Sequence, residues 1–390
     1  MTPEALGELR ARLVQRLRAR GDVRSDAVAA AFGRVPRHVF VRTISAAEAY
    51  ADRSIAIKFE DGVAISSSSQ PAIMAEMLEM LALRAGDRVL EIGAGSGYNA
   101  ALLAEIVGPS GSVTSVDIDP GLVADARRRL DEAGYERVRV LCADGALGDE
   151  AGAPFDAVIA AVGVERIPAA WIAQLRDGGR LVAPLTIRSL QKVVAFERTG
   201  DGLESRAVVD AAFMMLRGAS ASSDTRVLPL RDGTVTIRLF AERADRVDAR
   251  TLDALLRGPR ADARTSRRIA PEEAWTPFAL WLALEDDGFC RVTKQDGGAP
   301  RASIPSLVPE MDEHYGFVTT LGVCDADAIV VLFARAQHDV ALRRFGRGTA
   351  ALARVQSALA AWDAAGRPGN RQLRITVAAD GTTFARLGAA

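Results

Sequence analysis

Cysteine and histidine are scarce in this sequence, and their spacing argues against several kinds of site. Among the 390 residues there are only three cysteines and three histidines. The cysteines, Cys142, Cys290 and Cys324, lie far apart and form no Cys-x-x-Cys pair, which argues against a disulfide framework and against a zinc site. The histidines are equally scattered. We therefore expect neither a structural disulfide nor a bound metal.

The sequence also lacks an excess of charge and long hydrophobic runs. Its 49 basic residues balance 50 acidic ones, for a net charge of −1, so no general attraction to nucleic acid or to an anionic membrane is expected. No apolar run approaches the roughly 18 residues of a membrane-spanning helix, and the N-terminus has no apolar signal-peptide core. These features predict a cytoplasmic protein.

What the sequence does contain is enough apolar residues for more than one core. Hydrophobic residues make up 49% of the chain and charged residues 25%, an ordinary globular balance, and a length of 390 residues favours two domains. The stretch "GASASSDTR", residues 218–226, is small, polar and without periodicity, so we take it as the linker. The predicted domains are residues 1–217 and residues 227–390.

The chain begins with signals of two helices. Thr2 can cap the first helix, Pro3 suits its first turn and Gly21 suits its end. Ser25 can cap a second, shorter helix. From residue 84 onward the character changes, because short apolar runs alternate with helical segments in "DRVLEIGAG", "GSVTSVDID", "VRVLCADG", "FDAVIAAVG" and "GGRLVAPL". This alternation predicts a parallel sheet with right-handed crossovers.

The later residues predict antiparallel strands and a mixed second domain. Residues 192–200 and 204–216 have the composition of an antiparallel pair at the sheet edge. The expected elements of the second domain are a strand at 233–242, a hairpin that turns at 324–327, helices at 248–258, 271–286 and 348–365, and a last strand at 371–380. Aromatic residues at three-residue spacing in the helix at 271–286 are expected to be core.

Three glycines, Gly93, Gly95 and Gly97, follow the first strand of the alternating region in "VLEIGAGSG". Glycine lets the backbone turn tightly and pass close to a ligand, and the helix that follows adds a positive pole. Ala94 and Ser96 complete this loop. A Gly-x-Gly-x-Gly loop alone is weak evidence, since many nucleotide-binding folds have one.

Acidic residues at three strand ends sharpen the prediction. Glu91 precedes the glycine loop, where a carboxylate would repel a pyrophosphate but suit the cationic amino end of a sulfonium cofactor. Asp117, followed by Ile118, ends the next strand. A carboxylate there can accept hydrogen bonds from both ribose hydroxyls. Asp144, followed by Gly145, ends a third strand and can accept an adenine amino group. The alternative is that these carboxylates are solvated turn or capping residues.

The combined pattern resembles class I S-adenosyl-L-methionine-dependent methyltransferases. An NAD dehydrogenase is the competing interpretation, but it normally requires Gly-x-Gly-x-x-Gly at the first strand and a second nucleotide-binding half, and neither is present. The resemblance implies an α/β fold: a Rossmann-like doubly wound sheet with N-terminal helices, followed by a smaller α+β C-terminal domain. Residues 84–217 would form the cofactor-binding sheet, and residues 1–83 the N-terminal helices and the acceptor segment.

The order of motifs is similar to that of protein-L-isoaspartate O-methyltransferases. The motifs are "AYADRSIAI", "SSSSQPAIMAEMLEML", "VLEIGAGSGYNAALLA", "VTSVDIDPGL", "CADG", "PFDAVIAAVGVERIP", "LRDGGRLVAPL" and the closing "FMMLRG". In this family the serine segment holds the acceptor carboxylate. By resemblance, Ser69 is the catalytic serine, Ser67 takes the place of a threonine, and Ser66, Ser68 and Gln70 contact the substrate. A simpler interpretation is that Ser69 only caps the helix that begins at Pro71.

The departures from the family lie on the acceptor side. A Thr-Ala-Ala segment of the family is Ala161-Val162-Gly163 here, an isoleucine becomes Ser68, and the closing segment, which contributes Phe213, has changes on both sides of that residue. The C-terminal region extends beyond the usual end of the family. Together with the serine run, this extension resembles an actinobacterial branch associated with ribosomally made peptides such as lanthipeptides and graspetides.

Several functions are compatible with these features. The leading hypothesis is methylation of an aspartate in a cyclised precursor peptide, which leads to a succinimide or isoaspartate. The second is repair of isoaspartyl residues in damaged proteins. A small-molecule methyltransferase and a non-catalytic cofactor-binding module are further alternatives. In each catalytic case the expected cofactor is S-adenosyl-L-methionine without a metal, and the expected partner of the first two is a peptide or protein bearing aspartate or isoaspartate, with neither nucleic acid nor membrane involved.

Overall fold

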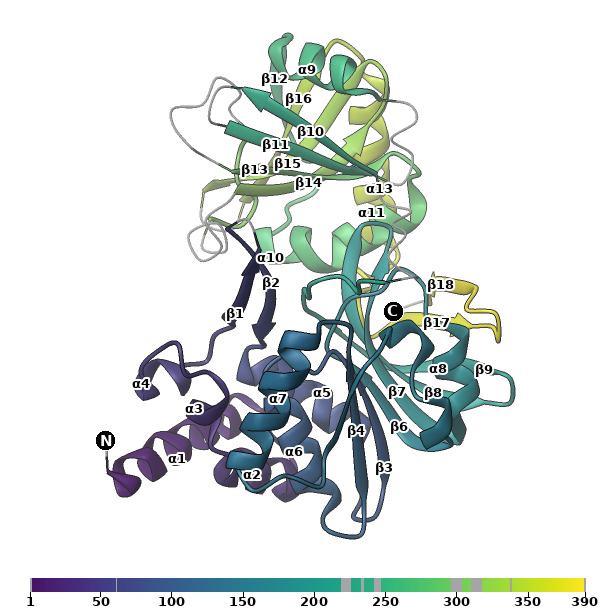
Figure 1. The fold of residues 1–390 in the computed structure, drawn as a ribbon. Coiled ribbons are helices and arrows are strands. Elements are labelled where there is room, and N and C mark those ends of the chain that lie inside the picture. The colour runs from purple at the N-terminus through teal and green to yellow at the C-terminus, as the bar shows by residue number, and fades with distance from the viewer. Residues whose placement is uncertain are drawn as a thin grey trace. The chain divides into compact units, whose positions relative to one another are not determined.

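The computed structural model describes residues 2–60, 62–218, 226–232, 235–241, 247–295, 304–309, 318–336 and 339–388. Most of the predicted linker therefore lies outside the described residues. The chain divides into two compact units, which we treat separately. The first comprises residues 1–185, 191–222 and 375–384, and the second comprises residues 186–190, 223–374 and 385–390. Figure 1 shows the elements of both units.

The first unit begins with the two predicted helices. Helix α1 (Pro3–Arg20) starts at Thr2, whose hydroxyl accepts from the Ala5 N–H at 3.3 Å, and ends at Gly21 with φ of +82°. Helix α2 (Asp26–Arg34) is capped by Ser25. The capping predictions for both helices are confirmed.

A nine-stranded sheet forms the centre of this unit, in the order β18-β17-β9-β8-β7-β6-β3-β4-β5. The pairs β3–β4, β4–β5, β3–β6 and β6–β7 are parallel, as predicted. These strands are β3 (Arg88–Ile92), β4 (Ser112–Asp117), β5 (Arg139–Cys142), β6 (Phe155–Ala160) and β7 (Leu175–Ile187). The intervening helices are α5 (Pro71–Leu81), α6 (Tyr98–Val107), α7 (Pro120–Glu132) and α8 (Ala169–Gln174).

The far side of the sheet differs from the prediction. Strands β8 (Leu190–Thr199) and β9 (Gly202–Asp210) pair antiparallel as expected, but they are not the edge. Strand β17 (Leu373–Val377) pairs with β9, and β18 (Thr383–Leu387) lies beyond it. The chain therefore returns to the first sheet with a segment that we had expected in the domain at 227–390, because pairing over so long a separation leaves no local sequence signal.

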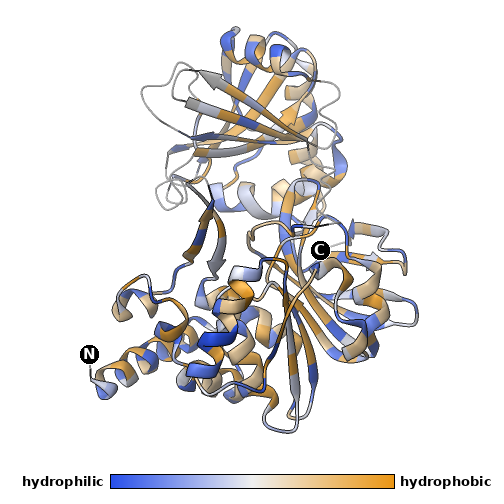
Figure 2. Ribbon diagram, in the orientation of Figure 1, coloured by the Kyte–Doolittle hydropathy of each residue, from blue (hydrophilic) through white to orange (hydrophobic). Residues whose placement is uncertain are grey.

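A large buried core of the first unit lies between one face of the sheet and the helices that cover it. Alternate residues along the central strands, such as Val89, Val113, Ala157 and Ile159, join one buried cluster with residues of α1, α2, α5, α6 and α7. Figure 2 shows hydrophobic residues along these strands. A two-stranded hairpin, β1 (Ile55–Glu60) and β2 (Val63–Ser68), and the short helices α3 (Arg37–Phe40) and α4 (Ala46–Ala49) precede α5.

The second unit is built on a seven-stranded antiparallel sheet in the order β10-β11-β13-β14-β15-β16-β12. The strands are β10 (Arg226–Asp232), β11 (Val235–Ala241), β12 (Arg260–Arg264), β13 (Phe289–Gln295), β14 (Val318–Cys324), β15 (Ala328–Ala336) and β16 (Asp339–Gly346). The helices are α9 (Ala249–Arg257), α10 (Pro271–Glu273), α11 (Ala279–Glu285) and α13 (Ala350–Ala364), and a π-helical turn at Ala274–Phe278 joins α10 to α11.

The mixed composition predicted for this region is confirmed in its described residues. The β14–β15 hairpin turns directly after Cys324, as expected. Phe278 is fully buried and its ring centroid lies 5.4 Å from that of Trp362, so this member of the aromatic stripe is core. His314 and His338 lie outside the described residues. Of the helices that the structure describes, none has the length and hydrophobicity needed to cross a membrane.

Candidate active site

The loops that carry the predicted site residues meet at one edge of the first sheet. Strands β3, β4, β5 and β6 run parallel, so their carboxyl ends lie together. The ends are in register: the Gly93 N–H donates to the Val116 carbonyl at 2.8 Å, and the Ala161 N–H donates to the Ile92 carbonyl at 2.8 Å. This edge is where open α/β sheets bind ligands.

The glycine loop depends on backbone angles that side chains disfavour. Gly93, Gly95 and Gly97 have φ of +94°, +51° and +87°, in the left-handed region where a Cβ atom is unfavourable. The Gly95 N–H donates to the Asp117 carboxylate at 3.0 Å, which ties the loop to the end of β4. The loop is therefore held by a strand-end carboxylate as well as by its own conformation.

Two of these glycines are also sites of close approach. A Cβ atom at Gly95 would lie 3.6 Å from the Ser66 hydroxyl and 3.7 Å from the Ser67 carbonyl oxygen. A Cβ atom at Gly93 would lie 3.0 Å from a methyl group of Val162. The glycine loop thus contacts the serine strand and the segment that follows β6, two regions that the sequence assigned to the acceptor side.

The side chains between the glycines point into the protein. Ala94 is 4% exposed and Ser96 is 3% exposed. The Ser96 hydroxyl accepts from the Tyr98 N–H at 3.3 Å, within the first turn of α6. This leaves the backbone of the loop, rather than these two side chains, for contact with a ligand.

Glu91 lies beneath the loop and is fully buried. Its carboxyl group accepts from the Asn99 amide at 2.8 Å and from the Ser115 hydroxyl. Burial raises the pKa of Glu91 to about 7, with the two hydrogen bonds acting in the opposite direction. Neither partner is marked in the sequence as part of a site, although Asn99 lies only eight residues further on in α6. In this structure Glu91 supports the loop from within, and its contact with a cofactor stays a prediction.

Asp117 and Ile118 lie at the end of β4. The Asp117 side chain is only 8% exposed, and its second oxygen accepts from the Asp119 N–H at 3.1 Å. The capping alternative therefore holds in part, because this carboxylate organises both the glycine loop and its own turn. Ile118 is 38% exposed, unusual for a large apolar side chain, and offers an apolar surface beside the strand ends.

Asp144 and Gly145 follow β5. The Asp144 carboxylate accepts from the Ala146 N–H at 2.9 Å and so caps a short 3₁₀ turn, Gly145–Leu147. A Cβ atom at Gly218 would lie 2.6 Å from a carboxylate oxygen of Asp144, so the end of the closing segment lies against this residue. A Cβ atom at Gly145 would lie 2.7 Å from the side chain of Ile92, which explains the need for glycine here.

Three of the four serines of the run lie in strand β2 of the hairpin, and Ser69 follows its end. Ser66, Ser67 and Ser68 lie opposite Lys58, Ala56 and Ile55. Ser68 is 4% exposed, and among the described residues its hydroxyl has no hydrogen-bond partner.

The helix that follows the serine run is not capped by Ser69. Gln70 occupies the N-cap position of α5, and its side chain makes no hydrogen bond to the helix N-terminus. Asp52 instead accepts from the Ala72 N–H at 2.9 Å and from the Gln70 amide at 3.1 Å. The simple capping interpretation of Ser69 is therefore wrong, because a carboxylate from outside the helix does that work.

The segment after β6 and the closing segment are bonded to each other. The Gly163 N–H donates to the Met214 carbonyl at 2.7 Å, and the Leu216 N–H donates to the Gly163 carbonyl at 2.8 Å. Gln191, which the sequence analysis missed, accepts from the Phe213 N–H. Phe213 is half-buried and packs against the core of the unit. The structure therefore brings Ala161–Gly163 and the closing segment together.

One carboxylate joins three segments around this edge. Asp119 caps α7 and accepts from Lys58 of the hairpin at 2.5 Å. Arg217 of the closing segment lies 3.9 Å from the same oxygen. The Lys58 ammonium lowers the pKa of Asp119, mainly through its hydrogen bond. No sequence signal marks these three residues, because they are distant along the chain and are of charged types that are common on protein surfaces.

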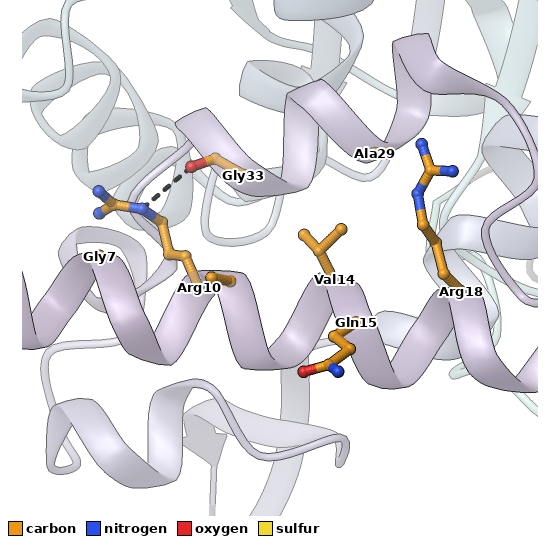
Figure 3. Close-up of a pocket in the computed structure, with 8 residues that line it drawn as sticks. Gly7, Arg10, Val14, Gln15, Arg18, Ala29 and Gly33 are labelled. Carbon is orange, nitrogen blue, oxygen red and sulfur yellow. Dashed lines mark hydrogen bonds between the residues drawn. The ribbon is translucent and has the colours of Figure 1, made fainter.

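A separate groove of about 450 Å³ lies between α1 and α2. Figure 3 shows Arg10 and Arg18 along α1 beside it, with Arg10 donating to the Gly33 carbonyl at 3.1 Å. None of the predicted site residues lines this groove, so it is not part of the candidate active site.

Comparison with known proteins identifies the family. The sequence model of the "Protein-L-isoaspartate(D-aspartate) O-methyltransferase (PCMT)" family matches residues 8–220. The chain belongs to the protein-L-isoaspartate O-methyltransferase family. A relative of that name from Methanopyrus kandleri is 41% identical over 211 residues, which is 54% of this chain and 91% of the relative. Another from Hyperthermus butylicus is 41% identical over 220 residues, 54% of this chain and 89% of the relative.

A solved structure of a protein-L-isoaspartate O-methyltransferase extends the likeness in fold. It is 23% identical, with a TM-score of 0.56, and the match covers 97% of this chain and 99% of the solved one. The predicted fold, a class I methyltransferase sheet with N-terminal helices and an additional C-terminal α+β region, is confirmed. The predicted cofactor, S-adenosyl-L-methionine, is the methyl donor of this family. The C-terminal region does not by itself separate this chain from other family members, because the likeness in fold includes it.

Proposed function

We propose that this protein is an S-adenosyl-L-methionine-dependent O-methyltransferase that methylates the free carboxylate of isoaspartyl residues in proteins and peptides. Membership of the family supports the reaction type, and the names of the 41% identical relatives support the substrate. One structural observation carries the proposal for this chain: the Ser66–Ser67 strand lies directly against Gly95 of the glycine loop. The acceptor segment and the donor-binding loop therefore belong to a single site.

The residues at the strand ends fit the methyl donor. Gly93 leaves room where a Cβ atom would crowd Val162, and Gly95 has a positive φ that a side chain disfavours. In this proposal Asp117 accepts the ribose hydroxyls, Asp144 and the Gly145 backbone hold the adenine edge, and Ile118 contacts the adenine face. Glu91 supports the glycine loop on which the amino acid end rests. When bound, the donor supplies a methyl group activated by a neighbouring positive sulfur.

The acceptor needs orientation more than activation. A carboxylate has a pKa of about 4 and is already ionised at neutral pH, so no general base is required. The hydroxyls of Ser67 and Ser69 are neutral donors that can hold a carboxylate without burying a countercharge. Val162, beside Gly93, and the closing segment would exclude water from the reacting atoms. In this proposal the serines orient the acceptor carboxylate, and the apolar segments shield it from water.

The leading hypothesis from the sequence is aspartate methylation in a cyclised precursor peptide. The named relatives do not support that substrate, and the C-terminal region that suggested it has a counterpart in the fold of a solved isoaspartate methyltransferase. The changes at Ala161–Gly163, at Ser68 and around Phe213 are the features that could alter the choice of acceptor. Isoaspartate is therefore the substrate that we propose, with the precursor peptide kept as a defined outcome of the test.

The test uses two synthetic peptides that differ only in carrying isoaspartate or aspartate at one position. Mass spectrometry follows the gain of a methyl group and its later loss as methanol when a succinimide forms. We expect methylation of the isoaspartyl peptide alone, and a large loss of turnover in Ser69→Ala. Methylation of a cyclised precursor peptide, with the isoaspartyl peptide untouched, would support the other substrate. Cofactor binding without any methylated peptide would contradict both.

A further inference from the structure

Arg37 of α3 is a fully buried arginine that lies behind the serine segment. Its side chain has no exposed surface, and burial lowers the pKa of its guanidinium group. The guanidinium donates to three backbone carbonyls: Ala51 at 3.2 Å, Arg53 at 3.2 Å and Ser69 at 2.9 Å. These partners are neutral oxygens rather than a carboxylate. Burial of a charge is costly unless its hydrogen bonds compensate. A fully buried arginine bonded only to neutral oxygens is therefore unusual.

The hydrogen bonding around the Arg37 side chain is incomplete. Among the described residues, its Nε atom has no hydrogen-bond partner, and neither has the buried hydroxyl of Tyr98, whose ring lies 5.6 Å from the guanidinium carbon. Buried polar groups are nearly always bonded. The three hydrogen bonds that the guanidinium group makes all come from its terminal nitrogens, and they go to the acceptor segment and the turn before it.

The shortest of the three bonds reaches the serine predicted to contact the acceptor. Hydrogen bonds from a charged donor are stronger than neutral ones, so the carbonyl of Ser69 is held firmly at 2.9 Å. This bond restrains the peptide plane that follows Ser69, and so the position of the Ser69 Cα atom from which the side chain projects. Arg37 thus bonds to the backbone that carries the Ser69 hydroxyl rather than to the hydroxyl itself.

Asp52 completes the support from the other side. It lies between Ala51 and Arg53, the two other residues whose carbonyls Arg37 binds, and it holds the Gln70 amide and the N-terminus of α5. Arg20 lies 2.7 Å from the same carboxylate, which is only 12% exposed. The residues just after Ser69 are therefore anchored through a carboxylate whose own backbone is anchored by Arg37.

We propose that Arg37 is a positioning residue for methyl transfer: through the Ser69 carbonyl, and with Asp52 on the following residues, it sets the acceptor-binding hydroxyl in its productive orientation. This inference rests on the proposed function for its catalytic meaning. It predicts a defect in turnover rather than in cofactor binding, since the donor-binding residues lie at the ends of β3, β4 and β5. An arginine is required because its planar fork can bind three carbonyls at once, which a single ammonium group does less well.

The test compares Arg37→Lys and Arg37→Met with a matched control, Arg16→Met. Arg16 also donates to a backbone carbonyl, that of Tyr50 at 2.7 Å, but it does not contact the acceptor segment. For Arg37→Met we expect kcat to fall by roughly ten-fold or more, with binding of S-adenosyl-L-homocysteine unchanged within about two-fold by calorimetry. Arg37→Lys should recover part of kcat, and Arg16→Met should keep it.

A second readout separates this proposal from the proposed function. Hydrogen exchange of residues 63–74 should be faster in Arg37→Lys than in the wild type, while α1 is unchanged. Should Arg37→Met fail to fold, Asp52→Asn carries the same expectations. A normal kcat in a folded Arg37 or Asp52 variant, or an equal fall in Arg16→Met, would overturn the positioning role. Failure of the wild-type protein to methylate isoaspartyl peptides would refute the function, but the exchange result would still decide whether Arg37 anchors the segment.

Discussion

Glu91 provides a prediction whose size can be worked out from the structure. Its pKa is raised from 4.5 to about 7, mainly by burial. The folded protein therefore prefers the protonated carboxyl group, and the stability that this preference contributes is fully present below pH 4.5 and is lost as the pH rises through 7. A shift of about 2.5 units, at about 1.4 kcal/mol per unit, corresponds to about 3 kcal/mol.

Substitution of Glu91 by glutamine removes this titration and keeps the shape of the side chain. The amide can still accept from Asn99, and Ser115 can rotate its hydroxyl to accept instead of donate. The free energy of unfolding of Glu91→Gln minus that of the wild type should therefore increase by about 3 kcal/mol from pH 4.5 to pH 8. The gain should appear without cofactor, since it arises from the buried carboxyl group itself.

Hydrogen exchange of the β3 amides measures this effect within the first unit, independently of the second. The free energy of opening is compared between the wild type and Glu91→Gln at each pH, so that all other titrating groups cancel. Glu136→Gln, which removes an exposed carboxylate from the same unit, controls for the loss of one negative charge. Parallel pH profiles for the wild type and Glu91→Gln would refute the reasoning, because they would mean that Glu91 has the same pKa in the folded and unfolded states.

Four further substitutions test the site. Ser69→Ala should lower kcat by roughly 10- to 100-fold and leave binding of S-adenosyl-L-homocysteine intact, because it removes one donor to a charged acceptor; normal turnover would remove Ser69 from the site. Asp117→Ala should do the reverse and weaken that binding by roughly 10- to 100-fold in calorimetry; unchanged affinity would contradict the assignment. Gly95→Ala should lower stability by about 1–2 kcal/mol in thermal unfolding, since its φ of +51° disfavours a side chain; an unshifted midpoint would argue against the strained loop. Lys58→Ala should cost less than about 1 kcal/mol overall, because Lys58 is 38% exposed, yet speed hydrogen exchange in β1 and β2; unaltered exchange would show that Asp119 does not anchor the hairpin.

Local sequence signals were sufficient for much of the fold. The caps at Thr2 and Ser25 mark the first helices because capping involves residues only three apart in the chain. The glycine loop and the acids at Asp117 and Asp144 were found because each follows directly on an apolar strand. Their position at one edge follows from the parallel sheet alone.

What the sequence did not reveal depends on contacts between distant residues. The pairing of β17 with β9 joins residues such as Thr376 and Glu204. Nothing in the sequence of either strand predicts which strand it pairs with. Serine is not a typical strand residue, so the strand at Ser66–Ser68 is set by its pairing with β1. Arg37 appears in the sequence as one more arginine among many, and only its burial distinguishes it.

The most direct test of the account is a crystal structure of the protein with S-adenosyl-L-homocysteine and an isoaspartyl peptide. We predict that the nucleoside lies along Gly93–Gly97, Asp117 and Asp144, and that the sulfur atom faces a carboxylate held by the hydroxyl of Ser69. A nucleoside bound elsewhere on the first unit, or a peptide carboxylate far from Ser69, would contradict it.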